Sequence, residues 1–434
     1  MPAPDTSSSP TRLPLSTGRL LSFDLIRGLA VLTIVVIHRV HYSWTGMADR
    51  ETLHRVMEVG GLQNVVIVII IILFTMGGLF YIVSGSVNAY AGYRAIASHR
   101  HAPGFIFWRN TKTGLFLIIL SIAHRVLFGN GFAYSASGGE PEYVTGLITG
   151  WLKYGEPVPF RWSLVTEPGT LSIIGIILLV NTGLMAAVHR RRGLGDGSTL
   201  ARVFLFSGIG ILLTYPFLKL SLTPLYEQMY AGGRYLEAWI LGHLCLEFGI
   251  APHLAFGLFG ALTGILLSAG TDRDCFTRRV RTMAYGLIGA GALITIVAGS
   301  VPVIADRLTR AGISIFGLGL FLFIELIALH LWDWRRRDAA ESPQRSWLVE
   351  RLRLFGRFSL TVFVFEGLLA GILAQSLSLA IGTGWMDSLW AVLGFTLLPV
   401  AVWTLLLSWW SRIQFDGPLE GVRRLWNYRA DLTP

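Results

Sequence analysis

The dominant pattern along the chain is a series of apolar stretches separated by short polar segments. Several of these stretches reach the roughly 20 residues that a helix needs to cross a bilayer. The pattern therefore predicts an all-α integral membrane protein, a single bundle of about ten transmembrane helices. The expected spans are Leu20–Val40, Val65–Tyr90, Gly114–Leu127, Gly169–Val188, Val203–Leu220, Ile250–Ala269, Tyr285–Pro302, Ile313–Trp332, Phe358–Ile381 and Leu389–Trp410.

The polar segments alternate in charge. Arginines gather in every second segment, in residues 94–112, 189–202, 272–281, 335–357 and the tail after Ser411. The segments between them hold few cations and many acids, namely Asp49, Glu51, Glu58, Glu140, Glu142, Glu156, Glu167, Glu227 and Glu237. Because positive segments stay in the cytosol, ten spans place both chain ends on the cytosolic side.

Composition agrees with this topology. Hydrophobic residues make up 53% of the chain and charged residues only 14%, against about a quarter in soluble domains. The net charge of +10 belongs to the cytosolic loops, so no nucleic-acid partner is expected. We expect one membrane domain over residues 19–411, a disordered cytosolic tail over 1–18 and a cytosolic C-terminal tail over 412–434. The first apolar stretch is expected to stay as an anchor, because no signal-peptide cleavage site follows it.

The first span carries groups that are costly in a bilayer. Asp24 and Arg27 lie near its start, and His38 and His41 lie near its end. The eleven helical steps between Arg27 and His38 leave both side chains within about 20° of one face. The same steps rise about 16 Å, roughly half of a hydrocarbon core. Charged groups at such positions indicate function unless they are paired or solvated.

Each of these groups has two interpretations. His38 is suited to general-base catalysis near neutral pH, or it is an interfacial histidine that ends the span. His41, one turn further, is a support or surface residue on the same side. Asp24 and Arg27 have the spacing of a helix-surface ion pair, so they either neutralise each other or hold an anionic ligand.

Further candidates lie in other spans. His124 and Arg125 end the third span, and His253 begins the sixth, all at the outer level of His38. Glu325 and Glu366 are intramembrane carboxylates and therefore functional candidates or helix-packing groups. His243 and Glu247 have helical ligand spacing, so a zinc site is an alternative to a solvated helix face, although no metal is expected.

Several short motifs carry a family resemblance. Asp24–Gly28 has the form Asp-x-x-Arg-Gly, and Arg27 and His38 have the form Arg-x10-His. The other motifs are GLFYIVSG at Gly78–Gly85, RNTK at Arg109–Lys112, FGRFSL at Phe355–Leu360 and GPLEGVRRLWNY at Gly417–Tyr428. Together they resemble the transmembrane acyltransferase superfamily, which includes heparan-alpha-glucosaminide N-acetyltransferase and the bacterial O-antigen acetylases. Lys112 stands where the family has arginine, which keeps the charge but loses the bidentate fork.

The resemblance implies acyl transfer in a bacterial inner membrane. The donor would be cytosolic acetyl-CoA, and the acceptor a hydroxyl or amine of an extracytoplasmic sugar, glycan or lipid-linked glycan. Arg109, Lys112 and Arg27 would bind the donor, although Arg109 and Lys112 are also explained as positive-inside anchors. The remaining roles are catalysis by His38, Arg27, Asp24 and Glu366 and substrate binding by His41, His124, Arg125 and His253. Glu366 ranks above Glu325 because its span follows FGRFSL.

Other functions fit part of the pattern. A transporter or a lipid or glycan flippase would use the same intramembrane acids, arginines and histidines as a substrate path. The absence of paired repeats in the sequence counts modestly against transport. Within acyl transfer, His38 either deprotonates the acceptor or first accepts the acyl group itself. The acyl chain length, N- or O-acylation and a homodimer are left open, and membrane lipids are expected partners.

Overall fold

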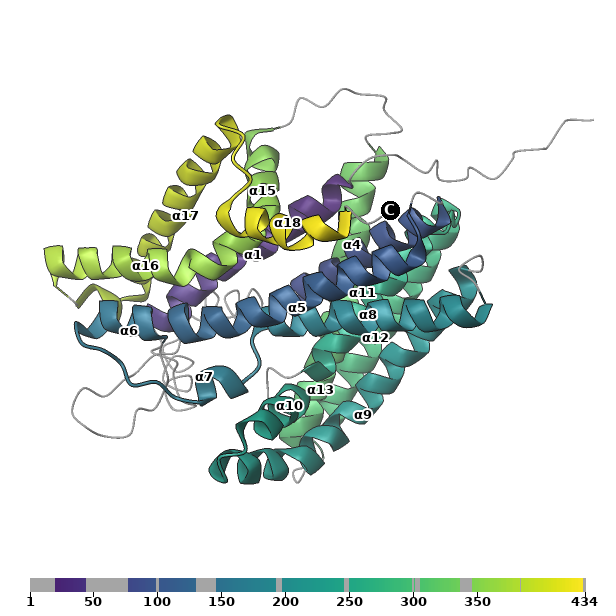
Figure 1. Ribbon diagram of the computed structural model, residues 1–434, viewed down its shortest axis with the longest axis horizontal. Coiled ribbons are helices and arrows are strands. Elements are labelled where there is room, and N and C mark those ends of the chain that lie inside the picture. Colours follow the sequence, from purple (N-terminus) through teal and green to yellow (C-terminus); the bar gives the residue numbers. More distant parts are fainter. Residues whose placement is uncertain are drawn as a thin grey trace, which may run out of the picture.

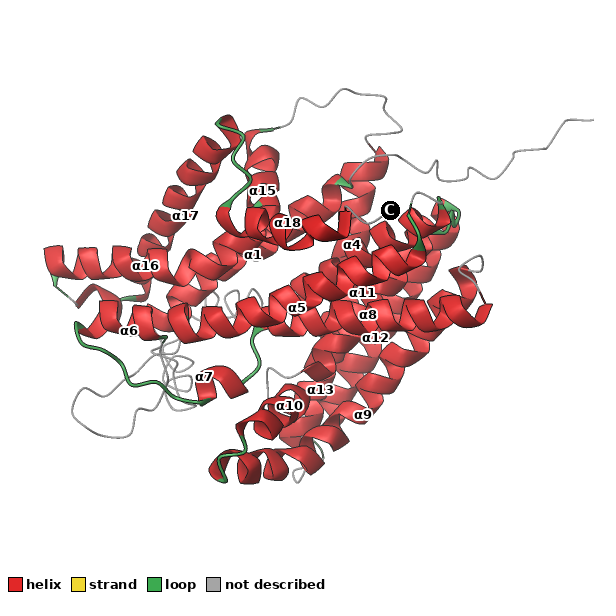
Figure 2. Cartoon of the chain, viewed as in Figure 1, coloured by secondary structure: helices red, strands yellow, loops and turns green. Residues whose placement is uncertain are grey.

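The computed structural model describes residues 20–43, 77–98, 101–129, 146–192, 197–245, 250–298, 300, 305–335, 346–382 and 384–431. Within these ranges every regular element is a helix, and no strand occurs (Figure 2). The expected tail over residues 1–18 lies outside the described residues. The predicted all-α class is confirmed.

Eight described helical segments are long and apolar enough to cross a membrane, which confirms a multi-pass integral membrane protein. They belong to α1 (Leu21–Ser43), α5 (Pro103–Phe128), α7 (Ser163–Thr166) with α8 (Thr170–Arg192), α9 (Gly197–Ala231), α12 (Arg273–Ala298), α13 (Ala305–Ala328) with the π-helix η1 (Leu329–Trp334), α16 (Ser359–Ile381) and α17 (Leu389–Arg412). The shorter elements are α6 (Leu147–Tyr154), α10 (Tyr235–Cys245), α15 (Trp347–Arg357), the 3-10 helix η2 (Gly384–Asp387) and α18 (Pro418–Asp431).

Two further expected spans correspond to α4 (Gly77–Ala97) and α11 (Ile250–Ser268). Residues 65–76 of the predicted second span lie outside the described residues. Helices α4 and α11 pack closely because small residues line their interface. A Cβ atom at Gly260 would overlap the carbonyl oxygen of Ile82, and one at Gly264 would overlap that of Ser86. The two helices therefore run side by side in the same direction through the main core (Figure 1).

Helix boundaries differ from the prediction where charged residues lie on helices. The third span was expected to begin at Gly114, whereas α5 begins at Pro103 and carries Arg109 and Lys112 within the helix. The expected C-terminal tail contains a helix, α18, that packs on α5 and α16. Trp426 of α18 donates to the carbonyl oxygen of Lys112 at 3.0 Å.

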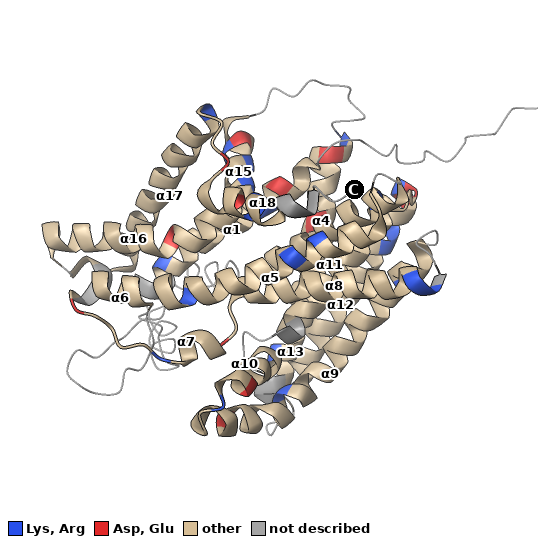
Figure 3. Cartoon of the chain, in the orientation of Figure 1, with Lys and Arg blue, Asp and Glu red and all other residues tan. Residues whose placement is uncertain are grey.

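Charged residues gather at one end of the bundle, around α15, α18 and the beginning of α1, whereas α9, α12 and α13 show long uncharged surfaces (Figure 3). We call this the arginine-rich end, and the sequence predicts that it faces the cytosol. The start of α1 is fixed there by a remote carboxylate. Asp333 of η1 accepts hydrogen bonds from the backbone amides of Leu21 and Ser22, at 3.0 and 3.1 Å. These amides have no partner within the helix, so a carboxylate stabilises them.

Candidate functional site

The first part of the site is a histidine–glutamate pair between α1 and α16. The Nδ1 atom of His38 lies 2.6 Å from Oε1 of Glu366. The carboxylate is almost completely buried, at 1% exposure, whereas the His38 side chain is 22% exposed. An ionised carboxylate can only accept, so Nδ1 carries the proton, and in the neutral imidazole Nε2 carries the lone pair. The pair therefore leaves Nε2 able to take a proton from a substrate.

Arg39 is a member of this site that the sequence analysis missed. Its Nη2 atom lies 3.6 Å from Oε2 of Glu366, and its side chain is 3% exposed. A buried guanidinium favours the ionised form of a neighbouring carboxylate by direct Coulomb attraction. The signal was present in the sequence, because an arginine inside a span beside a candidate base is a functional candidate.

His124 also belongs to this end of the site. It lies on α5 with its ring against Phe363 of α16, at a centroid distance of 5.7 Å. It is near enough to His38 and Glu366 to interact with both electrostatically. Its Nε2 atom is buried and has no hydrogen-bond partner among the described residues. The structure thus brings together His38, Glu366, Arg39 and His124 from three helices.

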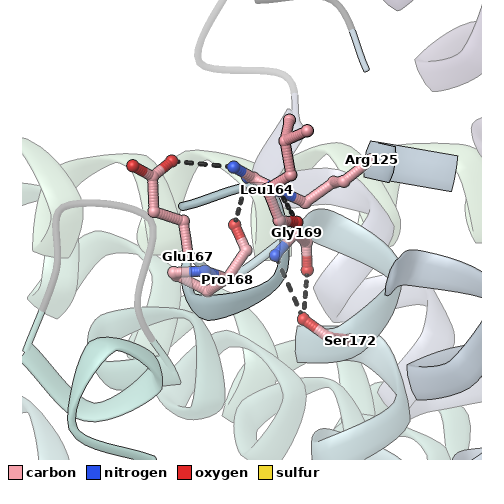
Figure 4. Close-up of polar contacts among 6 residues, drawn as sticks. All are labelled: Arg125, Leu164, Glu167, Pro168, Gly169 and Ser172. Atoms are coloured by element: carbon pink, nitrogen blue, oxygen red, sulfur yellow. Dashed lines mark hydrogen bonds and ion pairs between the residues drawn. The ribbon is translucent and has the colours of Figure 1, made fainter. Parts of the chain in front are cut away.

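Arg125 has a different position from His124. Its guanidinium contacts the segment before α8, donating to the carbonyl oxygens of Leu164 at 3.3 Å and Pro168 at 3.1 Å (Figure 4). It also forms an ion pair of 2.7 Å with Glu167. Arg125 therefore connects α5 to this segment, a structural role beside its predicted role in substrate binding.

The two other predicted substrate residues are less closely tied to the pair. The ring of His253 packs against Tyr81 of α4 at 4.6 Å and against Phe256 at 6.1 Å. These contacts place it at the α4–α11 interface. The side chain of His41 lies outside the described residues.

The second part of the site is a cavity of about 520 Å³ at the arginine-rich end. Its lining is strongly polar and comes from α1, α4, α5, α15, α16, α18 and the loop before α18. The lining residues are Arg27, Asn88, Arg109, Asn110, Thr113, Arg357, Ser359, Leu360, Asp416, Glu420, Arg423, Arg424 and Asn427. With five arginines against two acids, the lining carries a net positive charge that suits an anionic ligand.

Arg27 and Arg109 both lie in this cavity, as predicted donor-binding residues would. Arg27 also forms an ion pair with Asp24 at 2.6 Å, so the structural pairing and the position at the cavity occur together. Lys112 does not line the cavity; its Nζ atom lies 5.9 Å from the centre of the Trp108 ring. The cavity arginines from the tail, Arg423 and Arg424, were missed, although GPLEGVRRLWNY contains both.

A backbone contact between α1 and α15 sets the position of two cavity arginines. A Cβ atom at Gly28 would overlap the carbonyl oxygen of Leu352, and one at Gly356 would overlap that of Asp24. The two helices can approach this closely only because both residues are glycine. Arg27 precedes one glycine and Arg357 follows the other, so the contact places both guanidinium groups at the same cavity.

Glu420 connects the tail to the helix that carries Glu366. Its Oε1 atom accepts hydrogen bonds from the backbone amides of Leu360 and Thr361, at 3.0 and 3.1 Å. Its Oε2 atom accepts a hydrogen bond from the hydroxyl group of Thr361. A carboxylate at a helix N-terminus satisfies free amides and interacts favourably with the helix dipole. The start of α16 is thus fixed by the tail, as the start of α1 is fixed by Asp333.

Glu325 lies in a separate polar contact. Its Oε1 atom accepts a hydrogen bond of 3.0 Å from Thr263, whose hydroxyl group lies 3.0 Å from that of Ser86. These residues connect α13, α11 and α4 inside the core. The packing interpretation of Glu325 is therefore the one that its contacts favour.

His243 is engaged within its own part of the fold. Nδ1 donates to the carbonyl oxygen of Trp239 at 2.8 Å, and Nε2 accepts from the hydroxyl group of Ser172 at 3.0 Å. Burial lowers the pKa of His243 below its ordinary value. Glu247, its partner in the alternative zinc site, lies outside the described residues. Within the described part of the chain, no three His, Cys, Asp or Glu side chains gather as a metal-binding group.

Fold and site define a multi-span helical membrane protein with a His–Glu pair, whose carboxylate is buried, and an arginine-lined cavity. Residues 266–430, less than half of the chain, match a family model described as "Protein of unknown function (DUF418)". The match begins at the end of α11 and includes α12 to α18, and thus Glu366 and the tail arginines. A comparison with curated proteins gives no match.

Proposed function

We propose that the protein is a membrane-embedded acyltransferase that moves an acetyl group from cytosolic acetyl-CoA to a sugar. The acceptor is a hydroxyl or amine of an extracytoplasmic sugar, glycan or lipid-linked glycan. One observation carries the proposal: the same two helices, α1 and α16, supply both the His38–Glu366 pair and part of the arginine-lined cavity. A base and an anion site at different depths suit a reaction whose two substrates arrive from opposite sides.

The cavity has the properties of a donor site. Coenzyme A carries a diphosphate and a phosphate monoester, and arginine binds such groups through paired hydrogen bonds. Arg27 and Arg109 line the cavity, and Arg27 is about 16 Å along α1 from His38. The extended pantetheine arm of a bound donor would bridge this separation. The thioester would then lie near His38 while the nucleotide part stays in the cavity.

The His38–Glu366 pair supplies proton transfer. Nε2 of His38 takes the proton from the acceptor hydroxyl or amine, whose oxygen or nitrogen forms the new bond to the thioester carbonyl carbon. The carbon–sulfur bond then breaks, and the thiolate leaves with the proton from Nε2 as free coenzyme A. Glu366 keeps the imidazole in one tautomer and stabilises its positive charge during the reaction.

A covalent route uses the same residues. In that route Nε2 of His38 attacks the thioester and carries the acetyl group until the acceptor displaces it. Direct transfer is favoured, because a positioned base is sufficient for an already activated thioester. Direct transfer gives intersecting initial-rate lines, whereas the covalent route gives parallel lines and a coenzyme A burst without acceptor.

The test is release of coenzyme A from acetyl-CoA by the purified protein in proteoliposomes supplied with envelope glycans and lipid-linked glycans. We expect acceptor-dependent release that His38→Gln and Glu366→Gln lower by about 10²–10⁴-fold, since both lose the general base or its orientation. His38→Gln keeps hydrogen bonding but cannot take a proton at neutral pH. A transporter or flippase would release no coenzyme A, and wild-type turnover in folded His38→Gln would remove His38 from catalysis.

A further inference from the structure

The arginine-lined cavity contains an acid whose contacts differ from those of the other acids nearby. Asp416 lies in the loop between α17 and α18, and both of its carboxylate oxygens meet guanidinium groups that line the cavity. Oδ1 lies 3.1 Å from Nη2 of Arg357, and Oδ2 lies 2.6 Å from Nη2 of Arg424. The carboxylate thus holds two cavity arginines, one from α15 and one from α18.

The contacts of Asp416 are exchangeable, in contrast to those of Glu420 and Asp24. Glu420 binds backbone amides at the start of α16, and Asp24, which pairs with Arg27, is itself buried. The side chains of Asp416, Arg357 and Arg424 are 37%, 41% and 65% exposed. Ion pairs this exposed contribute little stability, because water screens the charges and two side chains lose freedom. A ligand anion can therefore replace the carboxylate at low cost.

The backbone beside Asp416 is unusual. Gln414 has a positive φ of 55° and Gly417 one of 83°, so left-handed residues lie on both sides of the acid. Glutamine rarely adopts this conformation, and the loop is short. Asp416 lies between these two residues and contacts Arg357 of α15 and Arg424 of α18. The Arg424 guanidinium also lowers the pKa of Asp416, so this carboxylate is charged at neutral pH.

We propose that Asp416 is an internal counter-ion that occupies a phosphate subsite formed by Arg357 and Arg424. A phosphate group of the ligand displaces it and takes over both guanidinium groups. Only the identity of that ligand as the acyl donor rests on the proposed function. The subsite itself follows from the two ion pairs and from the position of all three residues at the cavity.

Because a ligand must displace the Asp416 carboxylate, the subsite favours ligands with a high negative charge. A phosphate dianion binds the two arginines more strongly than a single carboxylate does, so exchange favours it. A ligand without a phosphate group at this position leaves Asp416 paired with the two arginines and gains no affinity from the subsite. Asp416→Asn frees the arginines beforehand, so a phosphate ligand no longer competes with a carboxylate. Asp416 thus weakens binding of the ligand, and only a ligand with enough negative charge can displace it.

The test measures binding of two probes, free coenzyme A and inorganic diphosphate, to detergent-purified protein by calorimetry. Asp416→Asn should tighten both about three- to tenfold, the range expected for release of two exposed ion pairs. Glu350→Gln is the matched control, because Glu350 is also half-exposed and paired with an arginine, Arg353, but does not line the cavity. It should leave both affinities unchanged.

A double-mutant cycle separates displacement from a general effect of charge. In the Arg357→Gln/Arg424→Gln background, Asp416→Asn should give no gain, because the groups that it frees are gone. A gain that persists there, an equal gain in Glu350→Gln, or no gain in Asp416→Asn would overturn the inference. Asp416→Ala, which also lacks the charge, should behave as Asp416→Asn does.

The two probes test the role of Asp416 and the proposed acyl donor separately. Tighter diphosphate binding without any coenzyme A binding would support the subsite and reject the acyl-donor assignment. Coenzyme A binding that Asp416→Asn does not tighten would support the donor assignment and reject the role of Asp416.

Discussion

Arg109 and Lys112 lie close together on α5 but have different surroundings. Arg109 lines the cavity, whereas Lys112 lies over the Trp108 ring and outside the cavity lining. If the cavity binds the donor, the two residues contribute differently, although the sequence motif joins them. Arg109 would contact phosphate in the ground and transition states alike, which is uniform binding.

We therefore expect Arg109→Ala to raise the apparent KM for acetyl-CoA about tenfold, with a smaller effect on the acceptor KM and on kcat. Lys112→Ala should change the donor KM by less than about threefold. Initial rates at varied donor and acceptor concentrations measure all three quantities. Equal effects of the two substitutions on donor KM would show that Lys112 also reaches the donor.

His243 gives a prediction on pH. Burial lowers its pKa in the folded protein, so between the folded and unfolded values the unfolded chain binds the additional proton. Stability therefore falls as pH drops below about 6.5, the value of an exposed histidine. Thermal unfolding in detergent at pH 7.5 and 5.0 should show this loss for the wild type. His243→Gln, which cannot titrate, should lose less between the same two pH values, and an equal loss would assign the effect to other groups.

At the scale of the elements, the closest approach in the site is that of α1 and α15. Gly28 and Gly356 permit it, and no larger residue fits against the backbone oxygens that they face. Their neighbours Arg27 and Arg357 depend on this approach for their place at the cavity.

We expect Gly356→Ala to destabilise the protein by about 1–3 kcal/mol, because the added methyl group must push α15 away from Asp24 of α1. Thermal unfolding in detergent measures the change, and coenzyme A binding should weaken as well. Gly371→Ala on α16 is the control, since a Cβ atom there meets nothing within 4 Å. If both variants behave alike, the α1–α15 contact is looser than the structure shows.

The sequence predicted which segments form helices more accurately than it predicted where each helix begins and ends. Apolar runs of span length identified α8, α16 and α17 with bounds close to those found. The third span was expected to begin at Gly114, with Arg109 and Lys112 on a helix face at its cytosolic entrance, whereas α5 begins at Pro103. Charge does not end a helix, however, and one face of α5 can present Arg109 and Thr113 to a polar cavity. The C-terminal tail was likewise placed in the cytosol because of its charge, and the helix α18 within it was not predicted. Glu420 of this helix binds the start of α16.

At the scale of the whole molecule, the site joins helices from both ends of the chain. Arg27 and Ser359 line one cavity while His38 meets Glu366, so α1 and α16 run in the same direction. Periodicity within one helix placed Arg27 and His38 on a common face, and the sequence ranked Glu366 as a candidate. It could not pair His38 with Glu366 or add Arg39, because contacts between distant spans leave no local pattern.

The topology is open to direct measurement. We expect a cysteine at Thr433 to be labelled from the cytosolic side and one within residues 138–142 from the opposite side, because arginines gather in alternate segments. Both would be introduced into a chain whose Cys245 and Cys275 are replaced by serine. Labelling of the two positions from the same side would contradict the ten-span arrangement.

The division of the site between the two ends of the chain affects how related sequences are compared. The segment that matches a family model, residues 266–430, contains Glu366, the capping acids Asp333 and Glu420, and the tail arginines. His38, Arg27 and Arg109 lie outside it. A chain that shares only this segment would have Glu366 and three of the five cavity arginines, but it would lack His38. Whether such a chain could carry out the proposed reaction depends on its first helix, which would have to supply the histidine that pairs with the glutamate.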